Sequence, residues 1–334
     1  DVPMSITAAS GDQLAKQRIH DTSELTRLVP SFSYQESNYG PPVFSIRGVG
    51  FLDYSVTSGP TVTAYIDQVP LPYSTMTRGA TLDLERVEVL KGPQGTLFGQ
   101  NSTGGAINYI AARPTKELAA GIDLSYGRYN EVIAGGFVSG PLTDRLRARL
   151  AVRHESMDGW QKSLTRPDDR LGGKEFYNGR LLIDWDASED LTFQLNISGW
   201  QDKSDMPAGQ LLAVIPQAPL TPRSAPYVEA LAQSPIPRSL READWDGDKE
   251  FERNNKFYMF SLRGDWQVTD EIAVTSITAY SHMTTHQPID VDGSAVSNFA
   301  FLRQDGLLKS FSEELRISGD MWALRWMIGG NYQR

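Results

Sequence analysis

The sequence contains no cysteine, and this absence removes several kinds of chemistry at once. Disulfide bridges, thiol catalysis and cysteine-ligated zinc sites are all excluded. The sequence also lacks any run of roughly 18 apolar residues, which excludes a membrane-spanning helix. A spanning barrel is not excluded, because barrel strands alternate apolar and polar residues and therefore escape an average taken along the chain.

Catalytic and metal-binding patterns are scarce as well. The four histidines are His20, His154, His282 and His286, and none forms a legible set with a nucleophile and an acid. His282 and His286 are four residues apart, a spacing that brings two ligands together on a helix but not at the strand-to-loop boundary expected here. We therefore expect neither an enzyme nor a histidine metal site.

Positive charge is in deficit, since 32 Lys and Arg face 41 Asp and Glu for a net charge of −9. This balance argues against nucleic acid or an anionic leaflet as the main partner. The first residues, DVPMSIT, have neither the basic region nor the apolar region of a signal peptide. We expect an exported protein to have lost that segment already.

The most organised stretch is residues 84–110, LERVEVLKGPQGTLFGQNSTGGAINYI. An alternating strand runs into a glycine-rich loop, and a second apolar run follows it. A phosphate cradle would need G-x-x-x-x-G-K-[ST] or G-x-G-x-x-G, and neither is present. The pattern therefore predicts a compact structural loop. The glycine and proline residues that predict this loop are Gly92, Pro93, Gly95, Gly99, Gly104 and Gly105.

This stretch resembles the plug-domain signature of TonB-dependent outer-membrane transporters. Three upstream segments match the family in the same order: residues 2–30, the SIRGVG of residues 45–50 and the PTVTAYIDQVPL of residues 60–71. The resemblance covers residues 1–113 and, more loosely, the rest of the chain. It implies a small plug domain over 1–113. A TonB box would lie upstream of residue 1, because no convincing copy is present here.

The residues themselves predict a small α+β domain for this region. Ser10 with Gln13 fits a capping box before a helix over 14–19, and Asp21 with Glu24 fits another before a helix over 25–29. Strands are predicted at about 43–47, 61–67, 85–90 and 105–110. A domain this short and glycine-rich would be marginally stable alone, which suits a plug packed inside a larger wall.

From residue 119 the hydrophobic period becomes two, which is typical of half-buried strands. Nine strands are predicted, near residues 122–126, 131–140, 146–153, 176–186, 191–198, 256–266, 271–282, 310–317 and 323–332. Plugged barrels have about 22 strands, so roughly 13 would be missing. We therefore interpret residues 119–334 as the N-terminal part of an antiparallel transmembrane β-barrel.

Loop lengths and tryptophans support the barrel interpretation. The connections at 141–144, 186–190, 267–270 and 318–321 are short, while those at 156–175, 201–255 and 283–309 are long. Only 127–130 is short where a long connection is due. Trp185, Trp266 and Trp322 lie beside short turns, and Trp160 and Trp200 lie toward long loops, as aromatic girdles predict. The alternative is a soluble β-sandwich with a tryptophan core.

The resemblance also implies residues that lock the plug. Arg47 lies in the IRG segment, and Glu85, Glu88 and Lys91 lie on the strand before the glycine-rich loop. Period two over residues 310–318 turns Glu314 and Arg316 to the lumen and Phe311, Leu315, Ile317 and Glu313 outward. We predict that Glu314 pairs with Arg47 or Lys91. A solvated loop arginine is the alternative for Arg47.

Two polar patterns leave their roles open. Arg145, Arg147, Arg149 and Arg153 form a one-sided stripe, which either attracts anionic solutes, pairs with plug carboxylates or is ordinary lumen surface. Asp244, Asp246 and Asp248 are similar to a calcium loop, but Gly247 is in the fourth position rather than the sixth. A solvated acidic loop is the alternative to calcium, and no other cofactor is expected.

The proline-rich loop at 201–255 suggests an outside-facing ligand or lid loop, with an inert excursion as the alternative. The resemblance implies a transporter in the outer membrane of a Gram-negative cell, in contact with its lipid. TonB, driven by ExbB–ExbD, would pull the plug. The first-ranked ligand is a ferric siderophore, followed by oligosaccharide, plant aromatic or cobalamin. A passive porin or adhesin barrel, a soluble binding module and a transporter that also signals are the rival classes.

Overall fold

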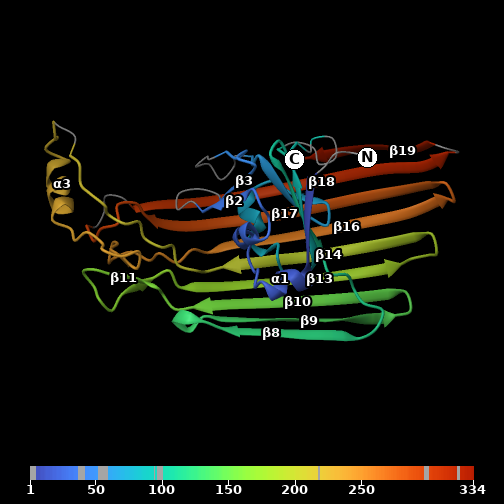
Figure 1. Cartoon of the computed structure of the whole chain (residues 1–334), viewed down its shortest axis with the longest axis horizontal. Helices are drawn as coiled ribbons and strands as arrows, with labels where there is room; N and C mark the ends of the chain where they lie inside the picture. Colours follow the sequence, from blue (N-terminus) through green and yellow to red (C-terminus); the bar gives the residue numbers. More distant parts are fainter. Residues whose placement is uncertain are drawn as a thin grey trace.

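The structure of the protein, a computed structural model, describes residues 5–36, 42–51, 59–93, 95, 101–216, 219–296, 301–321 and 324–334. It contains a five-stranded sheet in the N-terminal domain and a nine-stranded sheet, called the wall below. Figure 1 shows the N-terminal domain lying in front of the wall, whose long strands run side by side. Among the described residues, no helix has the length and apolar character needed to cross a membrane.

The N-terminal domain is a mixed sheet in the order β1-β6-β7-β4-β5. Strand β4 runs parallel to β7, and the other neighbours in this sheet are antiparallel. The elements are β1 (Ser5–Ser10), α1 (Gly11–Lys16), η1 (Thr22–Arg27), β2 (Phe32–Gln35), β3 (Val43–Ile46), β4 (Val62–Ile66), β5 (Val69–Leu71), η2 (Ser74–Gly79), β6 (Leu84–Lys91) and β7 (Gly105–Ala111).

The predicted capping boxes are confirmed, although the helices they start are short. Ser10 and Gln13 cap each other at α1, and Asp21 and Glu24 do the same at η1. The second helix is a 3-10 helix rather than the α-helix expected over 25–29. The predicted strands match β3, β4, β6 and β7, whereas β1, β2 and β5 were missed.

The wall is an antiparallel meander in which every strand pairs with its neighbours in the chain, so the nine predicted strands are confirmed. The strands are β8 (Ala119–Tyr126), β9 (Val132–Thr143), β10 (Leu146–Met157), β13 (Lys174–Asp186), β14 (Leu191–Asp202), β16 (Asn255–Thr269), β17 (Ile272–Asp290), β18 (Phe301–Met321) and β19 (Leu324–Gln333). The long loop predicted at 283–309 is wrong over most of its length, because β17 and β18 stay paired as far as Asp290 and Phe301.

The long connections form a small folded layer at one end of the wall (Figure 1). It contains β11 (Gln161–Ser163), β12 (Arg170–Leu171), β15 (Glu242–Ala243) and α3 (Ala225–Ala232), while η3 (Arg128–Asn130) closes the short connection there. The three short strands form one sheet over a buried cluster that includes Trp245 and Phe251. The connection at 201–255 therefore contains a helix and a short strand and is not entirely coil.

Alternate residues of each wall strand have opposite surroundings. On β16, Phe257 and Met259 are buried in the same hydrophobic cluster as the N-terminal domain, whereas Tyr258, Phe260 and Leu262 are exposed on the other face. The predicted orientation of residues 310–318 is confirmed, since Phe311, Leu315 and Ile317 are exposed. An apolar face exposed along the whole wall is the surface that a barrel presents to lipid.

Tryptophan placement corrects one expectation. Trp185 and Trp266 are about half exposed on the outer face beside short turns, as predicted. Trp200, in contrast, is buried on the inner face and donates its indole N–H to the N-terminal domain. Its even number on β14 places it with the inward residues, so alternation overrides the girdle argument. Trp322 lies outside the described residues.

Replacing Leu262 by arginine should destabilise the folded wall by about 2–4 kcal/mol in a lipid bilayer, because this side chain lies midway along the exposed apolar face. The free energy of unfolding is measured by denaturant titration of protein folded into lipid vesicles. Leu240→Arg is the matched control, since Leu240 is exposed in the loop layer. An equal loss in both variants would contradict the assignment of the outer face to lipid.

Candidate functional site

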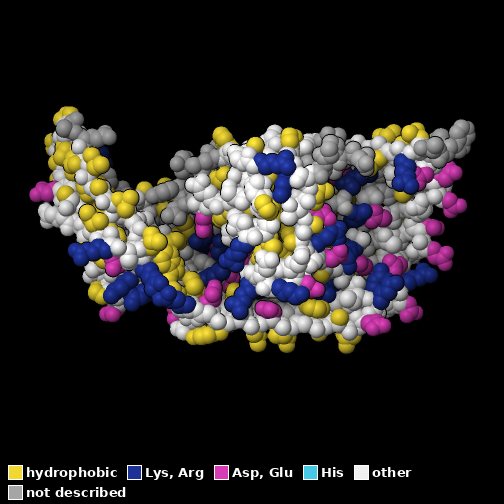
Figure 2. Space-filling view, in the orientation of Figure 1, with side chains coloured by type: hydrophobic (Ala, Val, Ile, Leu, Met, Phe, Trp, Pro, Cys, Tyr) yellow, Lys and Arg dark blue, Asp and Glu magenta, His cyan; other side chains and the backbone are white. Residues whose placement is uncertain are grey.

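The candidate site is the seam between the N-terminal domain and the inner face of the wall. One hydrophobic cluster crosses it, joining Met76 and Ala80 of the domain to Phe176, Trp200 and Met259 of the wall. Polar contacts surround this strip, and Figure 2 shows charged side chains gathered around the domain on the concave side of the sheet. The seam is therefore a mixed surface, with an apolar centre and many polar contacts.

The segment at residues 74–83 supplies most of these contacts, chiefly through its main-chain carbonyl groups. Three wall side chains donate to three of its carbonyl oxygens, in steps of three residues that match the short turn of η2. The pairs are Trp200 Nε1 to Met76 O at 3.3 Å, Asn178 Nδ2 to Gly79 O at 2.9 Å and Arg180 Nη1 to Leu82 O at 2.6 Å. The wall thus adds side-chain donors to carbonyls at the buried seam, and Gly79 O also accepts from the backbone N–H of Leu82 at 3.4 Å.

Gly79 lies so close to the wall that no side chain fits there. A Cβ atom at this position would lie 2.5 Å from the indole of Trp200 and about 3 Å from the amide of Asn178. Both neighbours are buried and hydrogen-bonded, so neither can move away freely. The absence of a side chain at Gly79 is therefore what allows the backbone to dock.

Gly79→Val should weaken the seam by about 1–3 kcal/mol, because the added carbons overpack a fixed contact. Hydrogen exchange at the amides of η2 should rise, and the release of the N-terminal domain in urea should move to lower concentration. Gly209→Val is the control, since a Cβ atom there meets nothing within 4 Å. If the η2 amides of Gly79→Val exchange at the same rate as in the parent protein, the close approach at Gly79 does not contribute to the stability of the seam.

The basic stripe on β10 faces the N-terminal domain. Both Nε and Nη2 of Arg149 donate to the Asp83 carboxylate, at 2.6 and 2.5 Å, and the guanidinium also lies over the Phe137 ring at 3.7 Å. Arg153 donates to the main-chain oxygen of His20 at 2.9 Å. Of the three alternatives left open for the stripe, pairing with a carboxylate of the domain is observed at Arg149, whose partner is almost buried.

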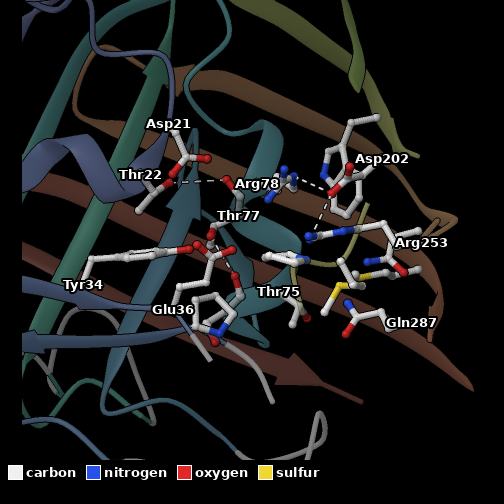
Figure 3. Close-up of a pocket in the computed structure, with 17 residues that line it drawn as sticks. Asp21, Thr22, Tyr34, Glu36, Thr75, Thr77, Arg78, Asp202, Arg253 and Gln287 are labelled. Carbon is white, nitrogen blue, oxygen red and sulfur yellow. Dashed lines mark hydrogen bonds and ion pairs between the residues drawn. The ribbon is translucent and has the colours of Figure 1, made fainter. Parts of the chain in front are cut away.

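Nearer the long loops, one carboxylate is shared by two arginines. Asp202, at the end of β14, is fully buried and lies 2.7 Å from Nε of Arg78 and 3.5 Å from Nη1 of Arg253. Figure 3 shows both guanidinium groups directed at this carboxylate. Arg78 belongs to η2 and Arg253 to the loop before β16, so Asp202 joins the N-terminal domain, the wall and the loop layer.

A cavity of about 70 Å³ lies beside this cluster, with room for more than one water molecule. Asp21, Tyr34 and Glu36 line it from the N-terminal domain, and Asp202 and Arg253 line it from the wall side. Burial, reinforced by the Asp21 and Glu36 carboxylates, raises the pKa of Tyr34 well above its usual value, so the phenol stays neutral. Burial lowers the pKa of Arg253 despite its carboxylate partner.

The predicted lock residues are placed differently from the expected pair. Glu314 and Arg316 both face inward, but Glu314 bonds to Arg316 on its own strand, at 2.5 Å. Arg316 in turn donates to Gln68 of the N-terminal domain at 2.7 Å. Arg47 is exposed, and its backbone N–H bonds to Ser31. A functional pairing of Glu314 with Arg47 or Lys91 stays a prediction.

On β6, Glu85 and Glu88 both bind Arg86, which leaves Lys91 at the strand end opposite Ser5 of β1. In the glycine-rich loop, Gly92 and Gly105 have positive φ, and a Cβ on Gly105 would lie 2.3 Å from the Leu90 carbonyl. Of the other predicted loop residues, Pro93, Gly95 and Gly104 are among the described residues, and Gly99 lies outside them.

The three loop aspartates have separate surroundings. Asp244 accepts from Ser163 and lies 3.7 Å from Arg166, Asp248 pairs with Lys249, and the backbone N–H of Asp246 bonds to Asp290. Among the described residues no group of three acidic, histidine or cysteine side chains is arranged to hold a metal ion. Calcium at this loop stays a prediction.

Sequence reasoning missed the cluster of Arg78, Asp202 and Arg253. One signal was present, because the even-numbered residues of β14 face inward and Asp202 continues that series to the strand end. A carboxylate at the end of an inward-facing series calls for a cationic partner. Nothing in the spacing, however, indicates which arginine that partner is.

Comparisons with known proteins agree with this geometry. The family profile for the TonB-dependent Receptor Plug Domain matches residues 1–106. The pesticin receptor of Yersinia pestis is 30% identical over 182 residues, covering 54% of this chain and 27% of that receptor. The ferric-pyoverdine BN7/BN8 receptor of Pseudomonas putida is 25% identical over 211 residues, covering 62% of this chain and 24% of that receptor.

The fold is also found among solved structures. The ferric yersiniabactin uptake receptor of Yersinia pestis matches with a TM-score of 0.80 at 20% identity, over 99% of this chain and 48% of that receptor. The chain therefore spans about half the length of that structure, and its alignments cover about a quarter of the two curated receptors. The similarity extends across both sheets, not only across the N-terminal domain.

Proposed function

Because this chain belongs to the TonB-dependent receptor family, we propose that it is the plug and part of the wall of an outer-membrane transporter for a ferric siderophore. The N-terminal domain is the plug, and the exposed apolar face of the nine-stranded sheet contacts membrane lipid. The observation that carries the proposal is the seam, where a separate domain fills the inner face of an amphipathic wall.

The chemistry of the seam suits a plug that is held at rest and displaced by work. Each hydrogen bond to a plug carbonyl contributes only about 0.5–1.5 kcal/mol net. Such contacts can be broken one after another and remade in water, whereas a wholly apolar seam would expose its full area at once. A periplasmic TonB protein, energised by ExbB–ExbD and the proton-motive force, would supply the pull. Its binding segment would lie upstream of residue 1.

The ligand class is proposed from the relatives. Two of them are named for ferric pyoverdine and ferric yersiniabactin, and both names describe iron chelates. A ferric siderophore is therefore the first candidate here, and it would bind at the loop end of the plug and wall. Oligosaccharide, plant aromatic and cobalamin are the other ligands to test. No catalytic step belongs to this proposal, because the relatives are named as receptors.

The test is uptake by a deletion strain that carries the intact gene. Growth and accumulation of radioactive iron are compared over a panel of ferric chelates, with cobalamin and glycans as further arms. We expect uptake of at least one ferric chelate, and we expect a protonophore to abolish it. Uptake that survives collapse of the proton-motive force would favour a passive porin and overturn the energised mechanism.

A separate measurement distinguishes a soluble binding module. The protein should require detergent for extraction and should migrate faster on gels when unheated, as folded barrels do. Recovery in the aqueous fraction without detergent would contradict a membrane wall, irrespective of which ligand is taken up.

A further inference from the structure

The turn at the end of β17 is joined to the loop layer by a buried carboxylate. Asp290 accepts from the backbone N–H of Asp246 at 3.2 Å and from the backbone N–H of Gly293 at 2.7 Å. Asp246 belongs to the segment before β16, 44 residues away in the chain. One side chain therefore closes its own turn and also binds a distant part of the loop layer. Residues 290–294 are called the latch below.

Two further contacts hold the latch against other parts of the loop layer. Tyr227 of α3 donates its hydroxyl group to the Asp292 carboxylate at 2.7 Å. Gly293 has a φ of +68°, and a Cβ atom there would lie 2.7 Å from the carbonyl oxygen of Gly209 and 2.8 Å from the backbone nitrogen of Leu211. The two backbones are therefore in direct contact, and only glycine fits at this point of the latch.

This interface is buried, but it is separate from the pairing of the wall strands. Asp290, Ser294 and Asp246 are each no more than 5% exposed. The ladder between β17 and β18 ends at the pair of Asp290 with Phe301, so the bonds to the loop layer are additional to it. Because the ladder does not depend on these bonds, the loop layer can open locally while the wall stays folded.

The charges around Asp290 make the contact sensitive to acid. β17 has 19 residues, about twice the number that a barrel strand needs to cross a membrane, so its last residue lies outside the bilayer. Burial, reinforced by the Asp292 and Asp246 carboxylates, raises the pKa of Asp290 to about 6. Tyr227 faces the same carboxylates from α3, and burial together with its bond to Asp292 raises its pKa, so the phenol stays neutral.

The direction of the effect follows from which state binds the proton more tightly. In the closed layer the pKa of Asp290 is about 6, whereas an open layer returns it toward the ordinary aspartate value of 3.8. The closed state therefore takes up a proton as the pH falls through 6, and the open state does not. Closure should be favoured about tenfold more at pH 5 than at pH 7.5. The neutral carboxyl group keeps acceptor capacity for the backbone N–H groups.

We propose that the latch at residues 290–294 holds the loop layer closed against the end of β17, and that acid tightens its hold. The layer lies at the end of the wall where a transported ligand would bind, so the latch controls how readily a ligand enters. The inference goes beyond the transport proposal, because opening and closing of the layer take place in the protein without any ligand.

The test is hydrogen exchange of the intact protein in detergent, with each rate corrected for the intrinsic effect of pH on exchange. Amides at 244–248 and 291–294 should be open about tenfold less often at pH 5 than at pH 7.5. Asp290→Asn should lose this pH dependence, because it cannot ionise. Asp290→Ala should be open at both pH values, because it has no acceptor. Asp168→Asn is the matched control and should keep the tenfold change, since Asp168 is exposed in the loop layer.

Histidine is the side chain that most often changes charge in this pH range, so a second control is needed. His286 lies on β17 near the latch and binds Asp305. His286→Gln should keep the tenfold change. Equal exchange of the parent protein at both pH values, a pH effect that persists in Asp290→Asn, or one that disappears in His286→Gln would each overturn the proposal.

The shift in gel mobility on heating verifies that each variant is folded. Where Asp290→Asn does not fold, Asp292→Asn replaces it and should reduce the pH effect, because it removes one of the two carboxylates that act on Asp290. An unchanged effect in that variant would also contradict the proposal. The exchange experiment contains no ligand, so its failure is distinguishable from failure of the transport proposal, which depends on iron uptake.

Discussion

Replacing Asp202 by asparagine is expected to loosen the plug from the wall by about 3–5 kcal/mol. The carboxylate is fully buried between Arg78 and Arg253, and its removal leaves two confined guanidinium groups facing one another. Asparagine keeps the shape of the side chain but cannot balance their charge. The cost is large because charges that are out of water depend on their partner, not on solvent.

The measurements are hydrogen exchange at the amides of η2 and denaturant titration of plug release. Cells that carry the variant should also become permeable to antibiotics that are normally too large to cross the outer membrane. Asp248→Asn is the matched control, because Asp248 pairs with Lys249 at the surface, where an ion pair contributes little. Adding Arg253→Gln to Asp202→Asn should recover part of the loss. If the two changes simply add, Asp202 does not act through the arginines.

The second large effect is expected at Arg149 and Asp83. Arg149→Gln and Asp83→Asn should each destabilise the seam by about 3 kcal/mol, and the double variant should lose clearly less than their sum. Asn is the suitable replacement for Asp83, because residue 83 has a positive φ that asparagine tolerates. Both partners are mostly buried, so either single change leaves a charge without its bidentate partner.

A double-mutant cycle on plug release measures this coupling, with Arg263 and Asp265 as the control pair. These two residues also form an ion pair, at 2.7 Å, but both lie on β16, so this pair does not join the plug to the wall. Their cycle should leave plug release unchanged. A coupling free energy near zero for Arg149 and Asp83 would mean that this contact is not part of the lock.

The wall was predictable from the sequence because the two faces of a sheet between lipid and lumen have different environments. Apolar and polar residues must therefore alternate along each strand. Every second residue of β16, from Tyr258 to Trp266, must suit one environment, and its neighbours must suit another. The same logic placed Glu314 and Arg316 inward correctly. Alternation along β14 also places Trp200 inward, where it is buried, whereas the expectation of an aromatic girdle was wrong for this residue.

The hydrogen bonds from the wall to residues 76–82 were not predictable, because their acceptors are main-chain oxygens. Asn178 and Arg180 bind the carbonyls of Gly79 and Leu82, and a carbonyl is the same group whatever residue carries it. No residue type marks those positions as binding partners. The expectation of a pair between Arg47 and Glu314 took two charged residues of opposite sign, but Glu314 has a nearer cation, Arg316, two residues along its own strand.

The sequence by itself determined the class of the protein, the nine wall strands, the direction of their two faces and the capping boxes of the plug, because each of these depends on residues close together in the chain. The tertiary structure alone decided which groups meet. Arg78, Asp202 and Arg253 come from three distant segments and meet only because the plug is docked on the wall. Contacts of this kind depend on how whole elements are placed, and no local pattern of residues records that placement.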